Sequence, residues 1–168
     1  NALKLEGILL THGHFDHIRD IKMFENLDSI PIYIHEEDYP FLYDDRLNYA
    51  PFFQSSFRLK KTAQVIKLID RQSLVFKDHE IQLYHTPGHT AGSSIYQWKN
   101  HLFTGDTLFC LGVGRTDLAT GSKRQLDSSL LWIMNHYSNQ DIIHPGHDKA
   151  STIGDERAMN PYVKILKK

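Results

Sequence analysis

The sequence has little cysteine, little charge imbalance and no long apolar run, and each absence excludes a class of protein. Cys110 is the single cysteine, so no disulfide can form within the chain, which fits a reducing compartment and leads us to expect a cytoplasmic protein. The formal net charge is −1, without a long basic run, and this gives no indication of a nucleic-acid partner. No apolar run approaches the roughly 20 residues of a membrane span, so we expect no membrane partner.

The length and composition are those of one ordinary globular domain. A chain of 168 residues is long enough to bury about 70% of its unfolded surface in one domain. Hydrophobic residues make up 40% and charged residues 23% of the sequence, as in typical globular proteins. We therefore expect a single domain over residues 1–168. The chain begins at Asn1 with neither a methionine nor a signal-like segment, and we expect it to be a piece of a longer polypeptide.

The most informative stretch directly follows the apolar run Leu5–Leu10. If that run is a strand, its end delivers His12, His14 and Asp16 at alternate positions on one side. His17 comes next and opens a segment with a helical apolar pattern. Imidazole and carboxylate groups both suit zinc and other first-row cations. Four such side chains within six residues predict a metal site where the strand ends.

Periodicity predicts the remaining elements. Strands are expected at Leu3–Leu10, Pro31–Ile34, Val65–Ile69, Ser73–Phe76, Glu80–His85, Ser93–Trp98, His101–Thr104 and Asp141–Ile143, and helices at Asp16–Leu27, Glu36–Tyr43, Lys123–Tyr137 and Thr152–Met159. The stretch between residues 43 and 64 has no clean period but is rich in aromatic residues. We interpret its aromatic side chains as local core, and a lid over a pocket stays the alternative.

Three further metal-capable residues follow predicted strands. The tripeptide Pro-Gly-His occurs at residues 87–89 and again at 145–147, and Gly105-Asp106 follows another strand. Glycine at such a position lets the backbone turn sharply and approach a ligand closely. The repeated placement adds His89, Asp106 and His147 to the candidate metal ligands.

The complete set of candidate ligands resembles that of the metallo-β-lactamase superfamily, with its His-x-His-x-Asp-His motif followed by His, Asp and His. The set comprises His12, His14, Asp16, His17, His89, Asp106 and His147. The resemblance spans nearly the whole chain. Residues 102–109 and the segment Gly114-Arg115-Thr116-Asp117 are similar to glyoxalase II (hydroxyacylglutathione hydrolase) relatives, and residues 152–161 are similar to their short bacterial members.

The resemblance implies an α/β fold, the metallo-β-lactamase-like αββα sandwich. The strands that normally precede the first motif are absent, so we expect one sheet to be short of strands. The resemblance also implies two divalent metal ions, with zinc expected and iron or manganese as alternatives. One ion would be held by His12, His14 and His89, and the other by Asp16, His17 and His147. Asp106 would bridge both.

The implied activity is hydrolysis of a small-molecule thioester, such as an S-2-hydroxyacylglutathione, by a metal-activated hydroxide. Metal coordination lowers the pKa of bound water towards about 7. A thiolate leaves readily because thiol pKa values lie near ~8.5. We expect Asp16 and Asp106 to act in catalysis as well as in metal binding. Arg115 is expected to bind a substrate carboxylate, and an ion pair with Asp117 is the alternative.

Two other functions stay open at this point. Mononuclear iron persulfide dioxygenases share most of these ligands, and there His12, His89 and Asp106 would form a two-histidine, one-carboxylate site. The third reading is a non-catalytic, metal-binding remnant. The metal content separates the first two, since a hydrolase would hold two ions and a dioxygenase one iron. No feature of the sequence specifies an oligomeric state.

Overall fold

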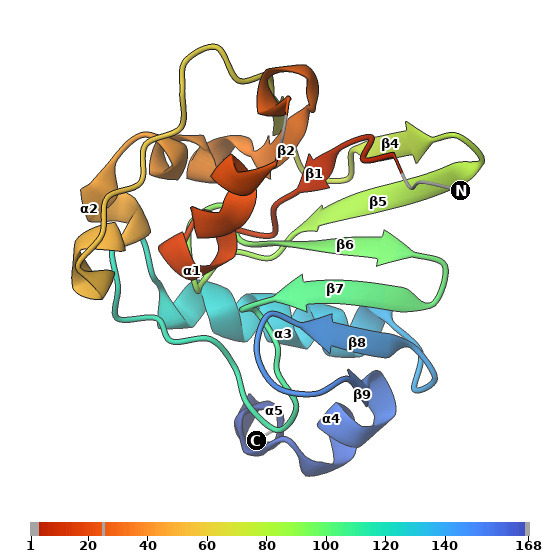
Figure 1. The fold of residues 1–168 in the computed structure, drawn as a ribbon. Helices are drawn as coiled ribbons and strands as arrows, with labels where there is room; N and C mark the ends of the chain where they lie inside the picture. Colours follow the sequence, from red (N-terminus) through yellow and green to blue (C-terminus); the bar gives the residue numbers. More distant parts are fainter. Residues whose placement is uncertain (1–3, 25, 167–168) are drawn as a thin grey trace.

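Two β-sheets pack against each other, with helices on both outer sides (Figure 1). The computed structural model describes residues 4–24 and 26–166. The first sheet is parallel, in the order β1 (Ile8–Leu9), β2 (Ile32–His35) and β3 (Val65–Leu68). The second has the order β4 (Ser73–Phe76), β5 (His79–His85), β6 (Ser94–Trp98), β7 (His101–Gly105), β8 (Ile142–Pro145) and β9 (Ser151–Thr152). The predicted αββα sandwich is confirmed, and the first sheet has three strands against six in the second.

The helices fall into two groups along the chain. The group on the first sheet comprises α1 (Phe15–Ile18), α2 (Asp45–Asn48) and the 3-10 helices η1 (Arg19–Met23), η2 (Leu27–Ser29), η3 (Glu36–Leu42) and η4 (Ala50–Phe53). The group on the second sheet comprises α3 (Lys123–His136), α4 (Ile153–Met159) and α5 (Pro161–Leu166). No helix in the described part of the chain is long and apolar enough to cross a membrane.

The pleat of each strand distributes its side chains between the layers. In β2, Ile32 and Ile34 are fully buried among the helices of the first layer, where they join Ile18. Tyr33 lies between them in sequence and points to the opposite face, towards the second sheet. There it packs with the cluster that includes Leu83 and Tyr96. The alternation thus builds two separate cores on the two sides of one strand.

The predicted amphipathic helix Lys123–Tyr137 is observed as α3. Its N-cap is Ser122, whose hydroxyl accepts a hydrogen bond from the Gln125 backbone nitrogen at 3.3 Å. Leu130 and Ile133 are buried in a cluster with residues of the second sheet. Helix α3 therefore covers the outer face of that sheet (Figure 1).

The helix predicted over Asp16–Leu27 is wrong in its extent. Only α1 and the short 3-10 helix η1 form, and Glu25 lies outside the described residues. Met23 and Phe24 are 80% and 46% exposed and do not face the core, and Leu27 reaches the core only from the separate 3-10 helix η2. Asn26 then adopts left-handed backbone angles with φ 58°, a conformation that asparagine tolerates and that ends a helix. The periodic pattern was therefore too short to sustain a longer helix.

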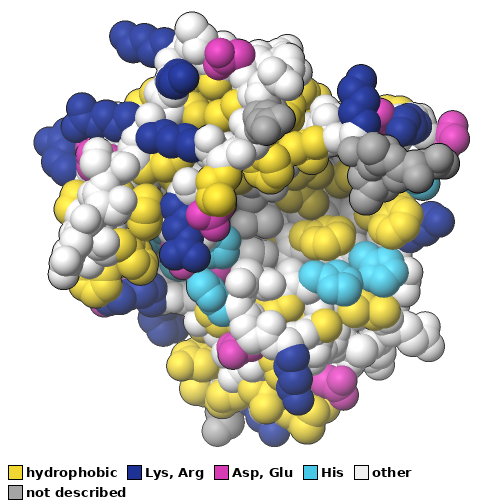
Figure 2. Space-filling view, viewed as in Figure 1, with side chains coloured by type: hydrophobic (Ala, Val, Ile, Leu, Met, Phe, Trp, Pro, Cys, Tyr) yellow, Lys and Arg dark blue, Asp and Glu magenta, His cyan; other side chains and the backbone are white. Residues whose placement is uncertain are grey.

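The first strand is also shorter than predicted. Its first predicted residue, Leu3, lies outside the described residues, and β1 spans only Ile8–Leu9. On the side where the first sheet is narrow, the inner face of the second sheet is open. Phe103 of β7 is 43% exposed and stacks on His144 of β8 at 5.1 Å between ring centroids. Figure 2 shows histidine and hydrophobic side chains gathered over this part of the sheet.

Candidate metal centre

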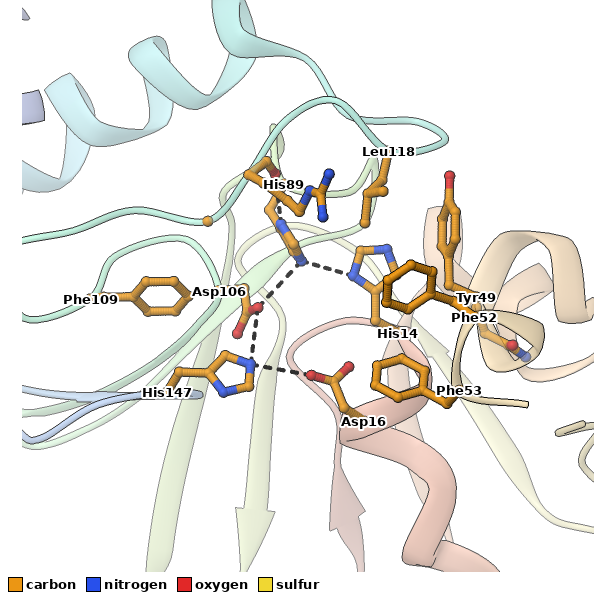
Figure 3. A pocket seen from close by; sticks show the side chains of 13 residues that line it. His14, Asp16, Tyr49, Phe52, Phe53, His89, Asp106, Phe109, Leu118 and His147 are labelled. Atoms are coloured by element: carbon orange, nitrogen blue, oxygen red, sulfur yellow. Dashed lines mark hydrogen bonds and ion pairs between the residues drawn. The ribbon is translucent and has the colours of Figure 1, made fainter. Parts of the chain in front are cut away.

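All seven predicted ligands meet at one edge of the sandwich, where loops leave the strand ends. His12 and His14 follow β1, Asp16 and His17 lie in α1, His89 follows β5, Asp106 follows β7 and His147 follows β8. Their ligand atoms form three groups within 4.8 Å: His12, His14 and His89; His12, His17 and Asp106; and Asp16, His17 and His147. Figure 3 shows the side chains of His14, Asp16, His89, Asp106 and His147 pointing towards one another.

The buried half of the centre consists of His12, His14 and His89. Their exposed fractions are 0%, 5% and 3%. Nδ1 of His14 lies 2.8 Å from Nε2 of His89. Nδ1 of His89 donates a hydrogen bond to the Arg115 carbonyl oxygen at 2.8 Å. That bond fixes the tautomer of His89, so the lone pair of Nε2 faces the other histidines and is free to bind a metal.

The open half consists of Asp16, His17 and His147. Their side chains are 31%, 16% and 51% exposed. Nε2 of His147 lies 3.2 Å from Oδ2 of Asp16, and Nε2 of His17 lies 3.7 Å from the same oxygen. This half therefore combines a carboxylate with two imidazoles at the solvent side of the centre.

Asp106 lies between the two halves. Its Oδ1 is 3.2 Å from Nε2 of His17, while its Oδ2 is 3.5 Å from Nε2 of His89 and 3.5 Å from Nε2 of His147. Its two oxygens thus face imidazoles of both halves. This is the place that a bridging carboxylate would occupy, because each oxygen can serve a different ion.

Burial keeps the histidines of the buried half neutral. Burial, followed by the nearby His17, lowers the pKa of His12 well below its usual value. Burial, followed by His89, lowers the pKa of His14 to about 3. Burial likewise lowers the pKa of His89. Neutral imidazole is the form that binds metals, so this half is ready for an ion at neutral pH without releasing protons.

The pKa values of His17 and Asp106 are shifted in the direction that favours their charged forms. Burial alone would lower the pKa of His17, but its contact with Asp106 and the charges of Asp106 and Asp16 raise it. Burial alone would raise the pKa of Asp106, but the His17 contact and the charges of His17 and His89 lower it. Asp106 is therefore ionised at neutral pH. A bridging ligand needs this charged form.

The buried polar atoms fit a metal ion. Within the described residues, Nε2 of His12, Nε2 of His14 and Oδ1 of Asp106 are buried without a hydrogen-bond partner. An unsatisfied buried polar atom costs about 1–3 kcal/mol. Zinc–nitrogen bonds are about 2.0–2.1 Å long, so ligand atoms within 4.8 Å of one another can close on an ion by small movements. The donor set, mixed imidazole and carboxylate, suits zinc or iron.

The glycines of the two Pro-Gly-His tripeptides serve different purposes. A Cβ atom on Gly146 would lie 2.4 Å from Oδ1 of Asp106, so only glycine lets this loop approach the bridging position. Gly88 has φ +141°, and a Cβ atom there would lie 2.3 Å from the Leu126 backbone nitrogen. Gly88 is therefore required for packing against α3, and Gly146 is required at the metal centre itself.

Sequence reasoning missed Asp38, a fully buried carboxylate next to the centre. It accepts hydrogen bonds from the Gly13 nitrogen at 2.9 Å, the Gly92 nitrogen at 2.7 Å and the Thr90 hydroxyl at 2.7 Å. Gly13 separates His12 and His14 in sequence, and Thr90 follows His89. We call this arrangement the Asp38 clamp, because it fixes both loops of the buried half to each other. Burial raises the pKa of Asp38 to about 6, in spite of these hydrogen bonds.

A cavity of about 460 Å³ opens over the metal ligands. Besides the ligands it is lined by Asn48, Tyr49, Phe52, Phe53, Phe109, Gly114, Arg115 and Leu118. The interpretation of the aromatic stretch as local core is therefore only partly right. Phe57 is 1% exposed and belongs to the core, whereas three aromatic residues of the same stretch line the cavity.

Arg115 lies at the cavity, but its guanidinium is paired. Nε donates to Oδ1 of Asp117 and a terminal nitrogen donates to Oδ2 of Asp117, both at 2.7 Å. The hydrogen bond and charge of Asp117 raise the pKa of Arg115 further. The ion pair left open by the sequence is thus present, and binding of a substrate carboxylate by Arg115 stays a prediction.

Comparisons with known proteins agree with this geometry. The family model of the metallo-beta-lactamase superfamily matches residues 1–152. The hydroxyacylglutathione hydrolase GloC of Haemophilus influenzae is 30% identical over 167 residues, which cover 96% of this chain and 77% of that protein.

Two solved structures are similar over most of the chain. The BLEG-1 B3 metallo-beta-lactamase is 35% identical with a TM-score of 0.86, covering 94% of this chain and 76% of that one. TTHA1623, solved in a di-iron-bound form, is 31% identical with a TM-score of 0.82, covering 95% and 78%. The family model, these relatives and the convergence of the seven ligands lead to one conclusion. The chain belongs to the metallo-beta-lactamase superfamily.

Proposed function

We propose that this chain is a metal-dependent hydrolase that cleaves a thioester at a two-metal centre. The observation that carries the proposal is the convergence of two ligand groups on either side of Asp106, at the wall of a cavity large enough for a substrate. The relative TTHA1623 was solved with two iron ions, which supports a dinuclear centre. Zinc is the expected metal, and iron or manganese are the alternatives.

The residues of the chain contribute orientation and charge. A bound metal pair supplies a Lewis acid for the carbonyl oxygen and lowers the pKa of water. Asp16 and Asp106 line the cavity and can accept hydrogen bonds from the attacking water, which aims its lone pair at the carbonyl carbon. The neutral histidines of the buried half leave the centre net positive when it is loaded, which favours a developing oxyanion.

A thioester fits this centre better than an amide. The leaving thiol has a pKa near ~8.5 and departs as a thiolate without a strong general acid. An amide nitrogen, as in a β-lactam, needs a proton donor or equivalent stabilisation, and sequence context assigns no residue to that task. The relative GloC is named a hydroxyacylglutathione hydrolase, which supports S-2-hydroxyacylglutathione as a substrate to test.

The persulfide dioxygenase alternative differs from the proposal in the role of the open half. A mononuclear centre at His12, His89 and Asp106 would leave Asp16, His17 and His147 without a metal to bind, although their ligand atoms lie within 4.8 Å of one another. Because those dioxygenases share most of the seven candidate ligands, the metal content rather than the ligand set separates the two functions.

The test is metal analysis of the purified protein, combined with release of free thiol from S-D-lactoylglutathione. We expect about two metal ions per chain and thiol release that a chelator abolishes. A β-lactam serves as the control substrate and should be hydrolysed far more slowly. One iron per chain, with oxygen consumption on a persulfide and no thiol release, would contradict the proposal.

A further inference from the structure

The cavity beside the metal ligands has one strongly apolar side. Tyr49, Phe52 and Phe53 stand together next to His14 and Asp16, and Leu118 lies above them (Figure 3). We call these four residues the apolar wall. Phe52 is 80% exposed and Phe53 is 47% exposed. Large aromatic side chains left in water at the edge of a cavity gain free energy when a ligand covers them.

The apolar wall is held in place by the fold. The Phe53 ring lies 5.3 Å from the ring of Phe15, the residue before the metal ligand Asp16. The Tyr49 hydroxyl accepts a hydrogen bond from the Ala119 nitrogen at 2.5 Å. The short helix η4 is bracketed by two residues in the left-handed region, Tyr49 with φ 64° and Gln54 with φ 53°. The wall is therefore pre-organised, which lowers the entropy cost of binding.

Buried hydrogen bonds of Asn48 also hold the segment around η4 in place. The fully buried Asn48 donates its side-chain amide to the carbonyl oxygens of Phe41 at 2.8 Å and Phe57 at 3.0 Å. Its side-chain oxygen accepts from the Ala50 nitrogen at 2.9 Å. All donors and acceptors of this amide face the protein, so Asn48 positions η4 rather than binding a substrate.

The cavity offers little free positive charge to an anionic group. Of the described residues that line it, Arg115 is the only lysine or arginine. Its guanidinium already donates two hydrogen bonds to the Asp117 carboxylate, from Nε and from one terminal nitrogen, both at 2.7 Å. Apart from the metal centre itself, recognition on this side therefore depends on apolar contact rather than on charge.

We infer that the apolar wall binds an aliphatic or aromatic group of the thioester substrate, and that Phe52 and Phe53 determine specificity for it. The inference rests on the proposed thioesterase activity and names the substrate class: thioesters with an apolar chain on the acyl or the thiol side of the bond that breaks. In hydrolysis, water adds to the carbonyl carbon, the carbon–sulfur bond breaks, and the sulfur leaves as a thiolate. The chain attached on either side of that bond can lie against the wall.

Two series of thioesters test the inference on the metal-loaded protein. The acyl series contains acetyl, butyryl and hexanoyl thioesters of one small thiol, and the thiol series contains acetyl thioesters of ethyl, butyl and hexyl thiols. We expect kcat/KM to rise about two- to fourfold per methylene in one series, in line with burial of each methylene. The series that rises identifies the side of the substrate that the wall binds.

Variants identify the residues responsible. The double variant Phe52→Ala, Phe53→Ala should flatten the rising series and keep the metal content. Phe24→Ala is the matched control, because Phe24 is 46% exposed and does not line the cavity. It should leave the rise unchanged. If thiol is released but neither series rises, or if the double variant keeps the full rise, the inference is overturned.

A binding measurement separates this inference from the proposed function. Absence of thiol release from every thioester would refute the proposed function alone. Calorimetry with non-hydrolysable thioethers, ethyl against hexyl, then tests the wall directly on the same protein. We expect the hexyl compound to bind at least about tenfold more tightly, and the double variant to lose that preference. Equal affinity for both compounds would overturn the inference whatever the catalytic result.

Discussion

The two halves of the metal centre differ in burial and in charge. The buried half holds three neutral histidines, the least exposed of the ligand set. The open half holds a carboxylate and two imidazoles that remain partly in water, with His147 half exposed. Removing a charged group from water is expensive, whereas a neutral imidazole can be buried at lower cost. The buried half thus consists of uncharged ligands, the open half turns its carboxylate, Asp16, towards solvent, and the ionised Asp106 between them is buried.

The difference in burial and charge suggests that the two halves have different roles. The buried half is fixed by the Asp38 clamp and by the hydrogen bond from His89 to the Arg115 carbonyl. The open half has no equivalent clamp within the described residues and lines the cavity through Asp16 and His147. We therefore expect the buried half to act as the rigid anchor of the centre and the open half to be the side that meets substrate and exchanges its ion more readily.

The largest effect is expected from Asp106→Ala, which removes the residue shared by both halves. We expect the loss of at least one tightly bound metal ion and a loss of activity greater than about 100-fold, since even outer partners of ligands cost 10- to 100-fold. Elemental analysis and thiol release measure both effects. His79→Ala is the control, because His79 is exposed and outside the centre. Full metal occupancy of Asp106→Ala would show that Asp106 does not bridge.

The next largest effect, a loss of metal affinity, is expected from a substitution at the Asp38 clamp. Asp38→Asn keeps the shape of the side chain but puts an amide donor against the Gly13, Thr90 and Gly92 donors. We expect metal affinity at the buried half to fall about 10- to 100-fold, with the second ion bound as before. Metal titration resolves the two ions. Asp44→Asn, at an exposed ion pair, should leave both affinities unchanged, and equal weakening of both ions would refute an anchor confined to one half.

In the metal-free protein, His14 and His17 should contribute to the pH dependence of stability with opposite signs. His14 takes a proton near 6.5 when unfolded but only near about 3 when folded. The unfolded state therefore binds more protons, and stability falls as pH drops below about 6.5, by up to about 1.4 kcal/mol per pH unit for each such histidine. His17 has a raised pKa, so its contribution is full below 6.5 and is lost as pH rises through its folded value.

Urea unfolding with a chelator, between about pH 4 and pH 8, measures this dependence. His14→Asn should make the acid side of the profile flatter, and His17→Asn should remove the loss on the alkaline side. If both variants change the same limb of the profile, the electrostatic contrast between the halves is wrong.

The smallest effect is expected from Arg115→Ala. The variant keeps the backbone carbonyl that accepts from His89, so the metal content should not change. Its side chain is paired with Asp117 at the surface, and exposed ion pairs contribute little. We expect KM for a glutathione thioester to rise by less than about fivefold, with kcat unchanged. A larger rise would show that Arg115 exchanges Asp117 for a substrate carboxylate, as the sequence alone suggested.

Much of the architecture, and the convergence of the seven candidate ligands, could be predicted from the sequence. Strand-end ligands are local signals, because a histidine or aspartate directly after an apolar run is visible in a few residues. The β4 bounds and the start of α3 followed from alternation and from the helical stripe. The extent of the helix after His17 could not be predicted, because exposure of Met23 depends on tertiary packing.

The residues that support the centre could not be predicted either, because their roles also depend on tertiary packing. Asp38 lies in the short acidic stretch Glu36-Glu37-Asp38, whose sequence is equally typical of a solvent-exposed first turn of a helix. Its role depends on three donors from two distant loops, which no local pattern encodes. The division of the aromatic stretch into core and cavity wall likewise depends on how η4 docks beside the metal ligands.

The Asp38 clamp also bears on the order in which parts of the chain fold. Its hydrogen bonds join residues separated by 25 positions, to Gly13, and by 54 positions, to Gly92. Contacts between such distant residues require large loops to close and therefore form late in folding. The three-histidine pocket joins His14 to His89, which lies 75 positions further along the chain. We therefore expect this pocket to bind a metal ion only after the strands on both sides of it have paired.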